Sequence, residues 1–213
     1  MGNVACEISW NLYGQPWSDP EWVGDIGMVQ GKASPEIQPN DSGNTSIDRY
    51  PLYIWEMPER KVKYTVAVDP SMGRESGDPA AIQVVDPFGR QIAEVLLRDR
   101  SLQEQCVVAT WLGNFYNVAT IVIEMNGIGG VLFTEAEKRM EYKNLYHERL
   151  SIPGFTTTCK TRDAMIRKMQ DSLKNGRPIL RSRRMREQFQ PYRGDGSAED
   201  DLLMSMLIAH YCV

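Results

Sequence analysis

Four acidic residues stand at positions where a folded chain can gather chemistry. Asp69 ends the apolar run YTVAVD, and Glu124 ends a second apolar run, ATIVIE. Asp200 and Asp201 come directly before the apolar stretch LLMSMLIAHYC, which is predicted to be a helix. Strand ends and helix starts are where α/β folds gather their sites. If the two runs form neighbouring strands, we expect Asp69 and Glu124 to lie close together, with the aspartate pair beside them.

Each acid also has an ordinary structural interpretation. Asp69 can cap the turn that follows it, and Glu124 can bond to the backbone of the NGIG turn. Asp200 is a good helix N-cap, and Asp201 suits the positive end of a helix dipole. As a set they favour a metal site, because closely spaced carboxylates repel one another unless a cation neutralises them or one takes a proton. Carboxylates and water suit a hard cation, so the expected cofactor is Mg2+ or Mn2+, as one or two ions.

An acid-only metal site near basic residues is typical of phosphoryl transfer. Two ions about 4 Å apart can activate a water and stabilise the leaving 3′ oxygen of a phosphodiester without a nucleophilic side chain. The sequence offers no convincing Ser-His-Asp or Cys-His set. The stretch GMVQGKAS fails as a nucleotide-binding P-loop, because it lacks the four-residue spacer and has Ala33 where Ser or Thr should follow the lysine.

The basic residues are concentrated in one segment of an acidic chain. The formal net charge is −4, but residues 160–193 contain eleven basic and three acidic residues, a formal charge of +8. A solvated helical face is the usual explanation of a charge run. Arginines crowded together with little acid between them repel one another, however, unless an anion lies nearby. The candidates for phosphate contacts are Lys160, Arg162, Lys174, Arg177, Arg181, Arg183, Arg184 and Arg186.

Hydrophobic periodicity places these side chains on an α/β scaffold. The expected strands are 62–69, 80–86, 91–98, 119–124, 144–149 and a short one at 178–180, and the expected helices are 101–117, 131–141, 161–175 and the stretch from 200 onward. Ser101 and Glu104 form a candidate capping box at the first of these helices. Three adjacent strands followed by α-β-α alternation predict a mixed sheet with helices on both faces. The runs 62–69 and 119–124 are predicted to be its central strands, because both are apolar on both faces.

The first 60 residues show weak periodicity and many turn formers. Residues 33–51 are predicted to be a long loop or a partly disordered segment. The four cysteines are scattered with no CxxC pair, which argues against a zinc site and against a disulfide framework. No stretch approaches the roughly 18 apolar residues of a membrane span, and the N-terminus lacks the layout of a signal peptide. We therefore expect a protein of a reducing compartment that is not secreted and has no membrane partner.

Taken in order, these motifs resemble one family, the nuclease domain of the large terminase subunit, which is the DNA-packaging motor of tailed bacteriophages. The matching stretches are VAVDPSMGRESGDPAA, IVIEMNGIGG, NLYHER, GFTTTCKTRDAMIRKMQDSLKNG and EDDLLMSMLIA, over about residues 61–213. The ordered set is much more specific than the acidic motifs alone.

The resemblance implies a ribonuclease H-like fold and a metal-dependent endonuclease that cuts double-stranded DNA during viral genome packaging. By motif, Asp69 is the first-strand acid, Glu124 is the second-strand acid, and the pair Asp200 and Asp201 supplies the third. The family often has histidine before this pair, whereas this chain has Glu199. The local metal geometry can therefore differ from that of the family.

The resemblance also implies partners and a cellular setting. These are double-stranded DNA, the portal protein, the small terminase subunit and the ATPase domain of the same polypeptide, in the cytoplasm of an infected bacterial host. Residues 61–213 would be the nuclease domain, and residues 1–60 a linker or the trailing segment of a missing N-terminal ATPase domain. Asp78 belongs to the GD dipeptide after the loop that follows the first strand, and it could hold the metal ligands in position without binding the ion itself.

Three other functions remain open on the sequence. A resolvase- or transposase-type nuclease of the same fold would use the same acids on other DNA. An actin-like nucleotide phosphotransferase also has an aspartate and a glycine turn after its first strand, but its second phosphate loop and adenosine pocket cannot be located here. In a non-catalytic DNA-docking module the acids would merely cap secondary structure.

Overall fold

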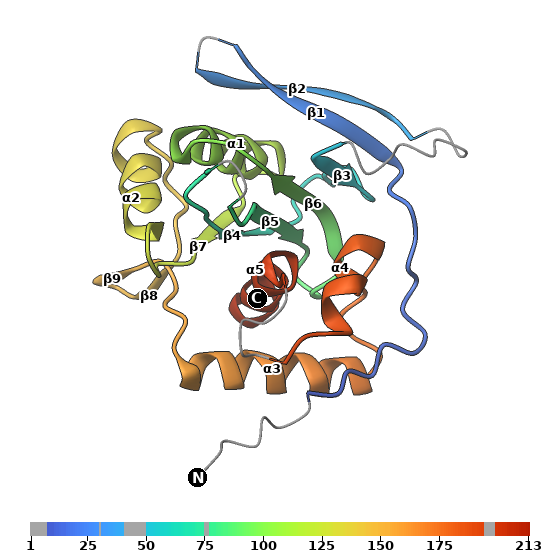
Figure 1. Cartoon of the computed structure of the whole chain (residues 1–213). Helices are drawn as coiled ribbons and strands as arrows, with labels where there is room; N and C mark the ends of the chain where they lie inside the picture. The colour runs from blue at the N-terminus through green and yellow to red at the C-terminus, as the bar shows by residue number, and fades with distance from the viewer. Residues whose placement is uncertain (1–7, 30, 41–49, 75–76, 194–198) are drawn as a thin grey trace.

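The protein consists of one mixed sheet between two helical layers (Figure 1). The computed structural model describes residues 8–29, 31–40, 50–74, 77–193 and 199–213. The sheet strands are β1 (Trp22–Val29), β2 (Lys32–Pro39), β3 (Leu52–Ile54), β4 (Thr65–Asp69), β5 (Ala80–Val85), β6 (Gln91–Leu97) and β7 (Thr120–Ile123). The helices are α1 (Leu102–Phe115), α2 (Gly129–Thr134) with a π-helical continuation (Glu135–Arg139), α3 (Cys159–Lys174), α4 (Arg183–Phe189) and α5 (Asp201–Cys212). The predicted α/β architecture with helices on both faces of a mixed sheet is confirmed.

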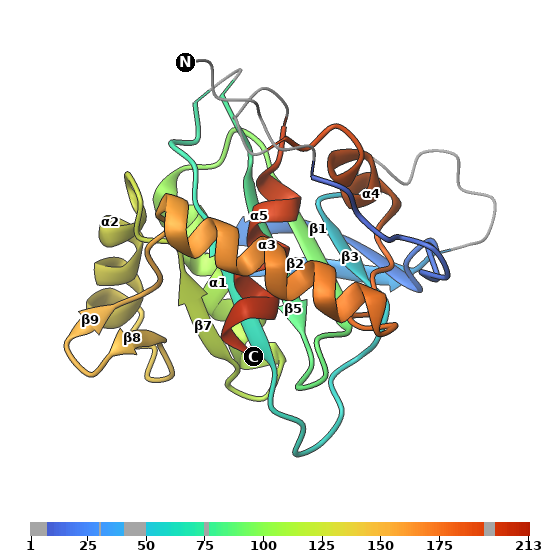
Figure 2. The same ribbon diagram turned by 90° about the horizontal axis from the view of Figure 1, so that it is seen from below.

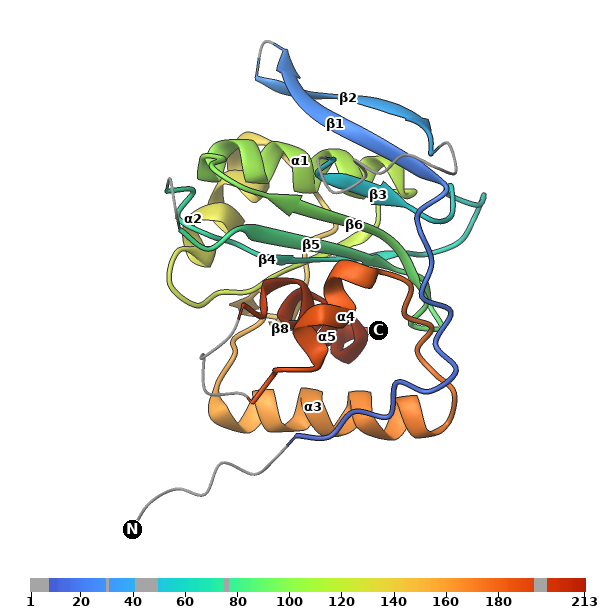
Figure 3. The ribbon, with the colours of Figure 1, turned by 45° about the vertical axis from the view of Figure 1, so that its right-hand side comes forward.

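The two faces of the sheet bury two separate apolar cores. Successive side chains of a strand point to opposite faces, so Val66 and Val68 of β4 join the core under α1 and α2, whereas Ala67 joins the core under α5. On the second face α5 lies directly on the sheet, and α3 covers α5 from outside (Figure 2). The view from the side shows α4 next to α5 and the β1–β2 ribbon beyond α1 (Figure 3).

The strand order brings the two acidic strand ends together. The sheet runs β2-β1-β3-β6-β5-β4-β7, and β4 and β7 are parallel neighbours. Val68 pairs with Ile123, and the amide of Glu124 donates to the carbonyl of Val68 at 3.0 Å. Asp69 and Glu124, the residues that follow this pair, therefore occupy the same edge of the sheet, as expected for neighbouring parallel strands.

Helix caps at α1 and α3 explain where these helices begin. Ser101 and Glu104 form the predicted capping box at the start of α1. Thr158 caps α3 by accepting from the amide of Thr161, whose side chain in turn accepts from the amide of Thr158. Both reciprocal pairs satisfy amides that would otherwise lack a partner in the first helical turn.

Helix α5 is apolar around most of its circumference because it is packed on two sides. Its residues from Leu202 to His210 are all buried, between the sheet and α3. His210 lies among them and exchanges a hydrogen bond with the Ser172 hydroxyl through Nε2 at 2.9 Å. Burial is the main cause that lowers the pKa of this histidine to about 4, and the nearby Lys168 lowers it further.

His210 should therefore make stability depend on pH on the acid side. Its folded pKa lies below its ordinary value of 6.5, so its stabilising contribution is present above that value and is lost as pH falls toward 4. Between pH 7 and pH 4.5 we expect wild type to lose about 2 kcal/mol more unfolding free energy than His210→Gln, which keeps a hydrogen-bonding group but does not titrate. Urea unfolding at both pH values measures this, and equal losses in the two proteins would contradict it.

The structure corrects several boundaries and one placement. Residues 33–39 are not loop, because β2 pairs with β1 over eight residue pairs; residues 41–49 of the predicted loop lie outside the described residues. The run 119–124 is not at the centre of the seven-stranded sheet: β7 is the last strand in the sheet order, and its outer side is paired only through isolated parallel bridges, Ile121 with Leu145 and Glu124 with Phe155. Residues 178–180 form no strand and meet the sheet through one hydrogen bond, from the Gln91 amide to the Ile179 carbonyl.

Two further differences concern short elements. Of the predicted strand 144–149, only β8 (His147–Arg149) is a strand, and it pairs with β9 (Ile152–Pro153) in a two-stranded sheet; Asn144 and Tyr146 exchange backbone hydrogen bonds with Ile121 of β7. Helix α4 was not predicted, because its seven residues are too few to display a helical period against their many charges.

The N-terminal segment packs against the second core. Trp10 makes an edge-to-face contact with Phe189 at 4.9 Å, and the amide of Ser18 donates to the carbonyl of Arg181 at 3.0 Å. Together with β1, β2 and β3, this segment forms part of the folded body (Figure 3). Whether it follows an ATPase domain in a longer polypeptide stays a prediction. None of the helices in the described ranges is long and apolar enough to cross a membrane.

Candidate functional site

Asp69 and Glu124 face one another at the carboxyl edge of the sheet. Burial raises the pKa of Asp69 well above its usual range, and the carboxyl of Glu124, which lies within hydrogen-bonding reach, raises it further. Asp201 and Asp200 add smaller contributions of the same sign to the pKa of Asp69. Among the described residues, neither Asp69 nor Glu124 makes an ion pair with a basic side chain. The two carboxyl groups therefore repel one another when both are ionised, and no basic side chain of the described residues is paired with either.

The start of α5 brings the aspartate pair to the same place. Asp200 is the N-cap residue by position, but its side chain makes no capping hydrogen bond, so capping does not account for it. Burial is the largest cause that raises the pKa of Asp200, with Glu124 and Asp78 adding to it and Arg162 opposing it. Burial likewise raises the pKa of Asp201 to about 7, supported by Asp78 and Asp200.

A cavity of about 480 Å³ opens onto Asp69 and Asp201, whereas Glu124 and Asp200 lie beside it and do not line it. Asp69, Asp78 and Asp201 line it together with Asn126 and the loop that follows β4. Asp78, which the sequence suggested as a supporting residue, therefore belongs to the same cavity and acts on the pKa of both aspartates of the pair.

The donor set suits a hard divalent cation in its chemistry. All of these side chains offer carboxylate oxygens, and their mutual repulsion is the kind that Mg2+ or Mn2+ relieves. Within the part of the chain that the structure describes, no three His, Cys, Asp or Glu side chains already stand at ion-binding distances. The four acids therefore lie near one another without forming a closed ligand cage, only Asp69 and Asp201 of the four line the cavity, and their role as ligands stays a prediction.

Two amide side chains hold the loops that carry the acids. Gln105 of α1 is fully buried and clamps the loop after Asp69: it accepts from the amide of Ser71 at 3.2 Å and donates to the carbonyl of Ser71 at 3.0 Å. Asn126, two residues after Glu124, exchanges two hydrogen bonds with the backbone of Thr157, at 2.7 and 3.1 Å. Sequence reasoning missed both residues. Asn126 stands two residues after a strand-end acid, which was a usable signal, whereas Gln105 lies inside an ordinary helical pattern.

The turn after Glu124 leaves no room for a side chain at Gly129. A Cβ at this position would overlap the carbonyl oxygen of Glu124, whereas a Cβ at the next residue, Gly130, would meet only the Met125 methyl at 3.7 Å. We expect Gly129→Ala to lower the free energy of unfolding by about 2–3 kcal/mol, since backbone must move to relieve the overlap. Gly130→Ala is the matched control and should be neutral or stabilising by about 0.5–1 kcal/mol, because alanine favours the helix. Urea denaturation of both variants measures the difference, and similar stabilities would show that the turn is not tight.

The basic residues predicted to contact phosphates differ in how exposed their side chains are. Those with exposed side chains are Lys160, Lys174, Arg177, Arg183 and Arg186. Arg162 is half-buried near the start of α3, where its charge acts on Asp200. Lys174 pairs loosely with Asp171 at 3.7 Å, and Arg186 lies over the Trp17 ring at 5.5 Å.

Arg181 and Arg184 have structural partners. Arg181 forms an ion pair with Glu56. Arg184 pairs with Glu94, which is fully buried, and its guanidinium lies over the Tyr53 ring at 3.7 Å. Their charges are already compensated inside the protein, so we leave these two arginines out of the set proposed to contact DNA.

The mixed sheet between two helical layers matches the ribonuclease H-like fold of large terminase nucleases. The expected likeness to large terminase nucleases is confirmed at the level of fold. The large terminase nuclease of thermophilic phage G20c, solved with bound cobalt, matches with a TM-score of 0.67 at 13% identity over 97% of this chain and 98% of that one. The same nuclease with bound magnesium matches with a TM-score of 0.66 at 12% identity over the same shares. The large terminase nuclease domain of Thermus phage P74-26 matches with a TM-score of 0.61 at 13% identity, over 75% of this chain and 84% of that one.

The likeness is one of structure. No protein-family model matches the sequence, and no curated protein matches it. At identities of this size the matches establish the fold, and the activity has to be argued from the site.

Proposed function

We propose that this protein is a divalent-metal-dependent endonuclease that hydrolyses phosphodiester bonds of double-stranded DNA. The observation that carries the proposal is the facing pair Asp69 and Glu124, which follow adjacent parallel strands beside the start of α5; burial and then the nearby Glu124 carboxyl raise the pKa of Asp69. The likeness to terminase nucleases solved with bound magnesium and cobalt supports it independently.

Each residue of the site has a role in this proposal. Asp69 and Glu124, with one or both of Asp200 and Asp201, would hold Mg2+ or Mn2+. When bound, such an ion supplies an activated water and positive charge for the leaving 3′ oxygen. Gln105 and Asn126 would keep the two acidic strand ends in register by fixing the loops that follow them.

Basic residues near the start of α3 would bind the backbone of the substrate. Lys160 is exposed there, and Arg162 lies close enough to Asp200 for its charge to act on that carboxyl. Contacts of this kind neutralise phosphates without reading bases, so binding should be sensitive to salt and weakly specific.

The biological setting that we propose rests on the likeness to terminase nucleases. In it the protein cuts DNA during viral genome packaging, in the cytoplasm of an infected bacterium. Its partners would be the portal protein, the small terminase subunit and an ATPase domain of the same polypeptide. Residues 61–213 would carry the nuclease site, and residues 1–60, which also supply β1, β2 and β3 of the sheet, would join it to that ATPase domain.

The metal requirement provides the direct test. Supercoiled plasmid should be nicked and then linearised in Mn2+ or Mg2+, and should stay intact in EDTA, because the carboxylates alone supply no nucleophile. A branched duplex assayed beside a linear one separates a packaging nuclease from a resolvase, which would prefer the branch. Cutting that continues in EDTA, or plasmid binding without product in either metal, would contradict the proposal; the second result would indicate a docking module.

A further inference from the structure

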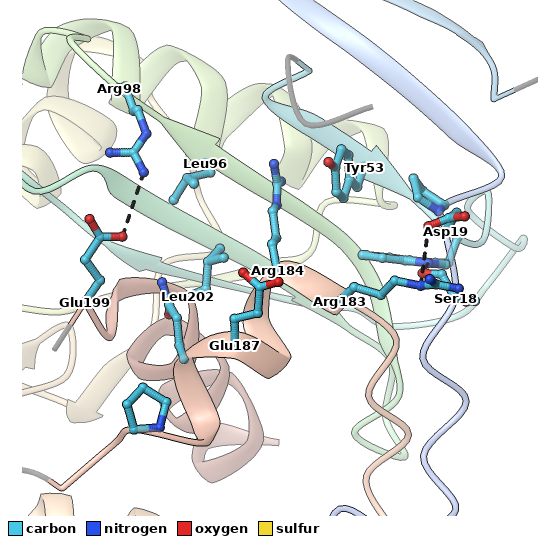
Figure 4. Close-up of a pocket in the computed structure, with 14 residues that line it drawn as sticks. Ser18, Asp19, Tyr53, Leu96, Arg98, Arg183, Arg184, Glu187, Glu199 and Leu202 are labelled. Carbon is cyan, nitrogen blue, oxygen red and sulfur yellow. Dashed lines mark hydrogen bonds and ion pairs between the residues drawn. The ribbon is translucent and has the colours of Figure 1, made fainter. Parts of the chain in front are cut away.

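A second cavity lies beside the acidic one, at the start of α5. Its volume is about 630 Å³, larger than the cavity at the acids. Strand β6, helix α4 and the segment before β1 form its walls (Figure 4). We call it the arginine groove after three of the residues that line it. Its charged lining residues are Arg98, Arg183, Arg184, Asp19, Glu187 and Glu199.

The start of α5 is a wall shared by the two cavities. Glu199 and Leu202 line the arginine groove, whereas Asp201 lines the cavity at the acids. Glu199 lies in the segment just before the helix and Leu202 in its first turn, and both face the arginine groove, whereas Asp201 between them faces the cavity at the acids. A polymer bound at Asp201 can therefore continue over the first turn of α5 into the groove.

Arg184 forms a fixed part of the groove lining. Its ion pair with buried Glu94 and its position over the Tyr53 ring hold the guanidinium, which also donates to the carbonyls of Tyr50 and Pro51 at 3.2 and 3.1 Å.

Arg98 and Arg183 are held much more loosely. Arg98 lies 3.9 Å from Glu199, and Arg183 lies 3.5 Å from Asp19, between side chains that are all more than half exposed. Exposed pairs at such distances contribute little to stability, so a competing anion can replace either carboxylate at small cost. Figure 4 shows the two arginines at separate ends of the groove, with Arg184 between them.

We propose that the arginine groove binds the sugar–phosphate backbone of DNA flanking the cleavage position, with Arg98 and Arg183 exchanging Glu199 and Asp19 for phosphates. Cations spaced along an open groove match a chain of phosphates better than a single small anion. When DNA is absent, Glu199 and Asp19 pair with the two arginines in place of phosphates. This proposal rests on the nuclease function proposed above and extends the substrate contact beyond the residues predicted from the sequence, among which Arg98 was not included.

The test is binding of a short fluorescein-labelled duplex, followed by anisotropy in EDTA so that cleavage and metal do not contribute. The double variant Arg98→Gln/Arg183→Gln should bind about tenfold more weakly, with a slope of log K against log salt that is smaller by about 2. The double variant Asp19→Asn/Glu199→Gln should bind about threefold more tightly, because the two carboxylates no longer compete with phosphates for the arginines. Arg149→Gln on β8, an exposed arginine on the other side of the molecule from α4 (Figure 1), is the matched control and should change affinity by less than about twofold.

The outcomes separate the two proposals. If wild type binds DNA but both double variants behave like the Arg149→Gln control, the groove is not part of the DNA path, and the nuclease proposal stands. If wild type shows no salt-dependent DNA binding in EDTA, the groove proposal fails, and the nuclease proposal is decided separately by plasmid cleavage in Mn2+ or Mg2+. Thermal unfolding of every variant confirms that weaker binding does not come from an unfolded protein.

Discussion

Asp69→Asn is expected to lower the rate of DNA cleavage by about 10³-fold, equivalent to about 4 kcal/mol of activation free energy. The substitution keeps the size of the side chain and removes the charge that faces Glu124 at the end of β4. It should also weaken Mn2+ binding, measured by titration calorimetry, by at least about tenfold, since a neutral amide is a poorer ligand for a hard cation. In EDTA the same variant should be more stable than wild type by about 1 kcal/mol, because one of two repelling carboxylates is gone.

Slower cleavage, weaker Mn2+ binding and higher stability of Asp69→Asn would together identify Asp69 as a metal ligand. Asp171→Asn, on the exposed face of α3, is the control for removing a carboxylate elsewhere, and it should leave cleavage, Mn2+ binding and stability nearly unchanged. Full cleavage by a folded Asp69→Asn protein would remove the proposed metal centre. A loss of activity accompanied by lower stability would indicate a structural role for Asp69 instead.

The second large effect concerns stability and arises at Glu94. This carboxylate is fully buried in β6 and accepts hydrogen bonds from Gln83, Gln91 and Ser182 at 2.8, 3.1 and 2.9 Å as well as pairing with Arg184. Glu94→Ala leaves the Arg184 charge largely buried without its partner and should cost about 3–5 kcal/mol of unfolding free energy. Urea denaturation measures the loss.

A double variant shows whether the loss comes from the orphaned charge. Glu94→Leu/Arg184→Met should recover most of the stability lost in Glu94→Ala, because replacing both members of a buried pair removes the unpaired charge. Glu187→Ala, an exposed acid on α4, is the control and should change stability by less than about 0.5 kcal/mol. A loss below about 1 kcal/mol in Glu94→Ala would show that the pair is not an anchor of α4.

The Glu94 network also explains why sequence reasoning overestimated the basic surface. Arg181, Arg183, Arg184 and Arg186 are close in sequence, and a count of charges treats them alike. In the folded protein Arg184 points to a carboxylate in a strand 90 residues earlier, whereas Arg183 stays in solvent. Which arginines remain available to an anion is decided by partners far away in the chain, and local composition carries no record of them.

The N-terminal part of the sheet was missed for a related reason. Residues 32–39 alternate between exposed and half-buried positions in β2, but Pro35 and Pro39 and the polar residues around them hide this pattern in the sequence. The strand exists because β1 offers it a continuous ladder. Edge strands tolerate proline, so strand-breaking residues are a weak guide there.

By itself the sequence determined the local elements with strong periodicity or clear caps and the placement of Asp69, Glu124, Asp200 and Asp201 at their ends. Apolar runs, the Ser101 capping box and the apolar stretch of α5 are encoded within a few neighbouring residues, so they can be read without the fold. Only the tertiary structure decided that β4 and β7 are parallel neighbours, that β7 is the last strand in the sheet order, and that the start of α5 separates two cavities. These features depend on pairings between distant segments, whose free energy arises from burial and hydrogen bonding across the whole domain.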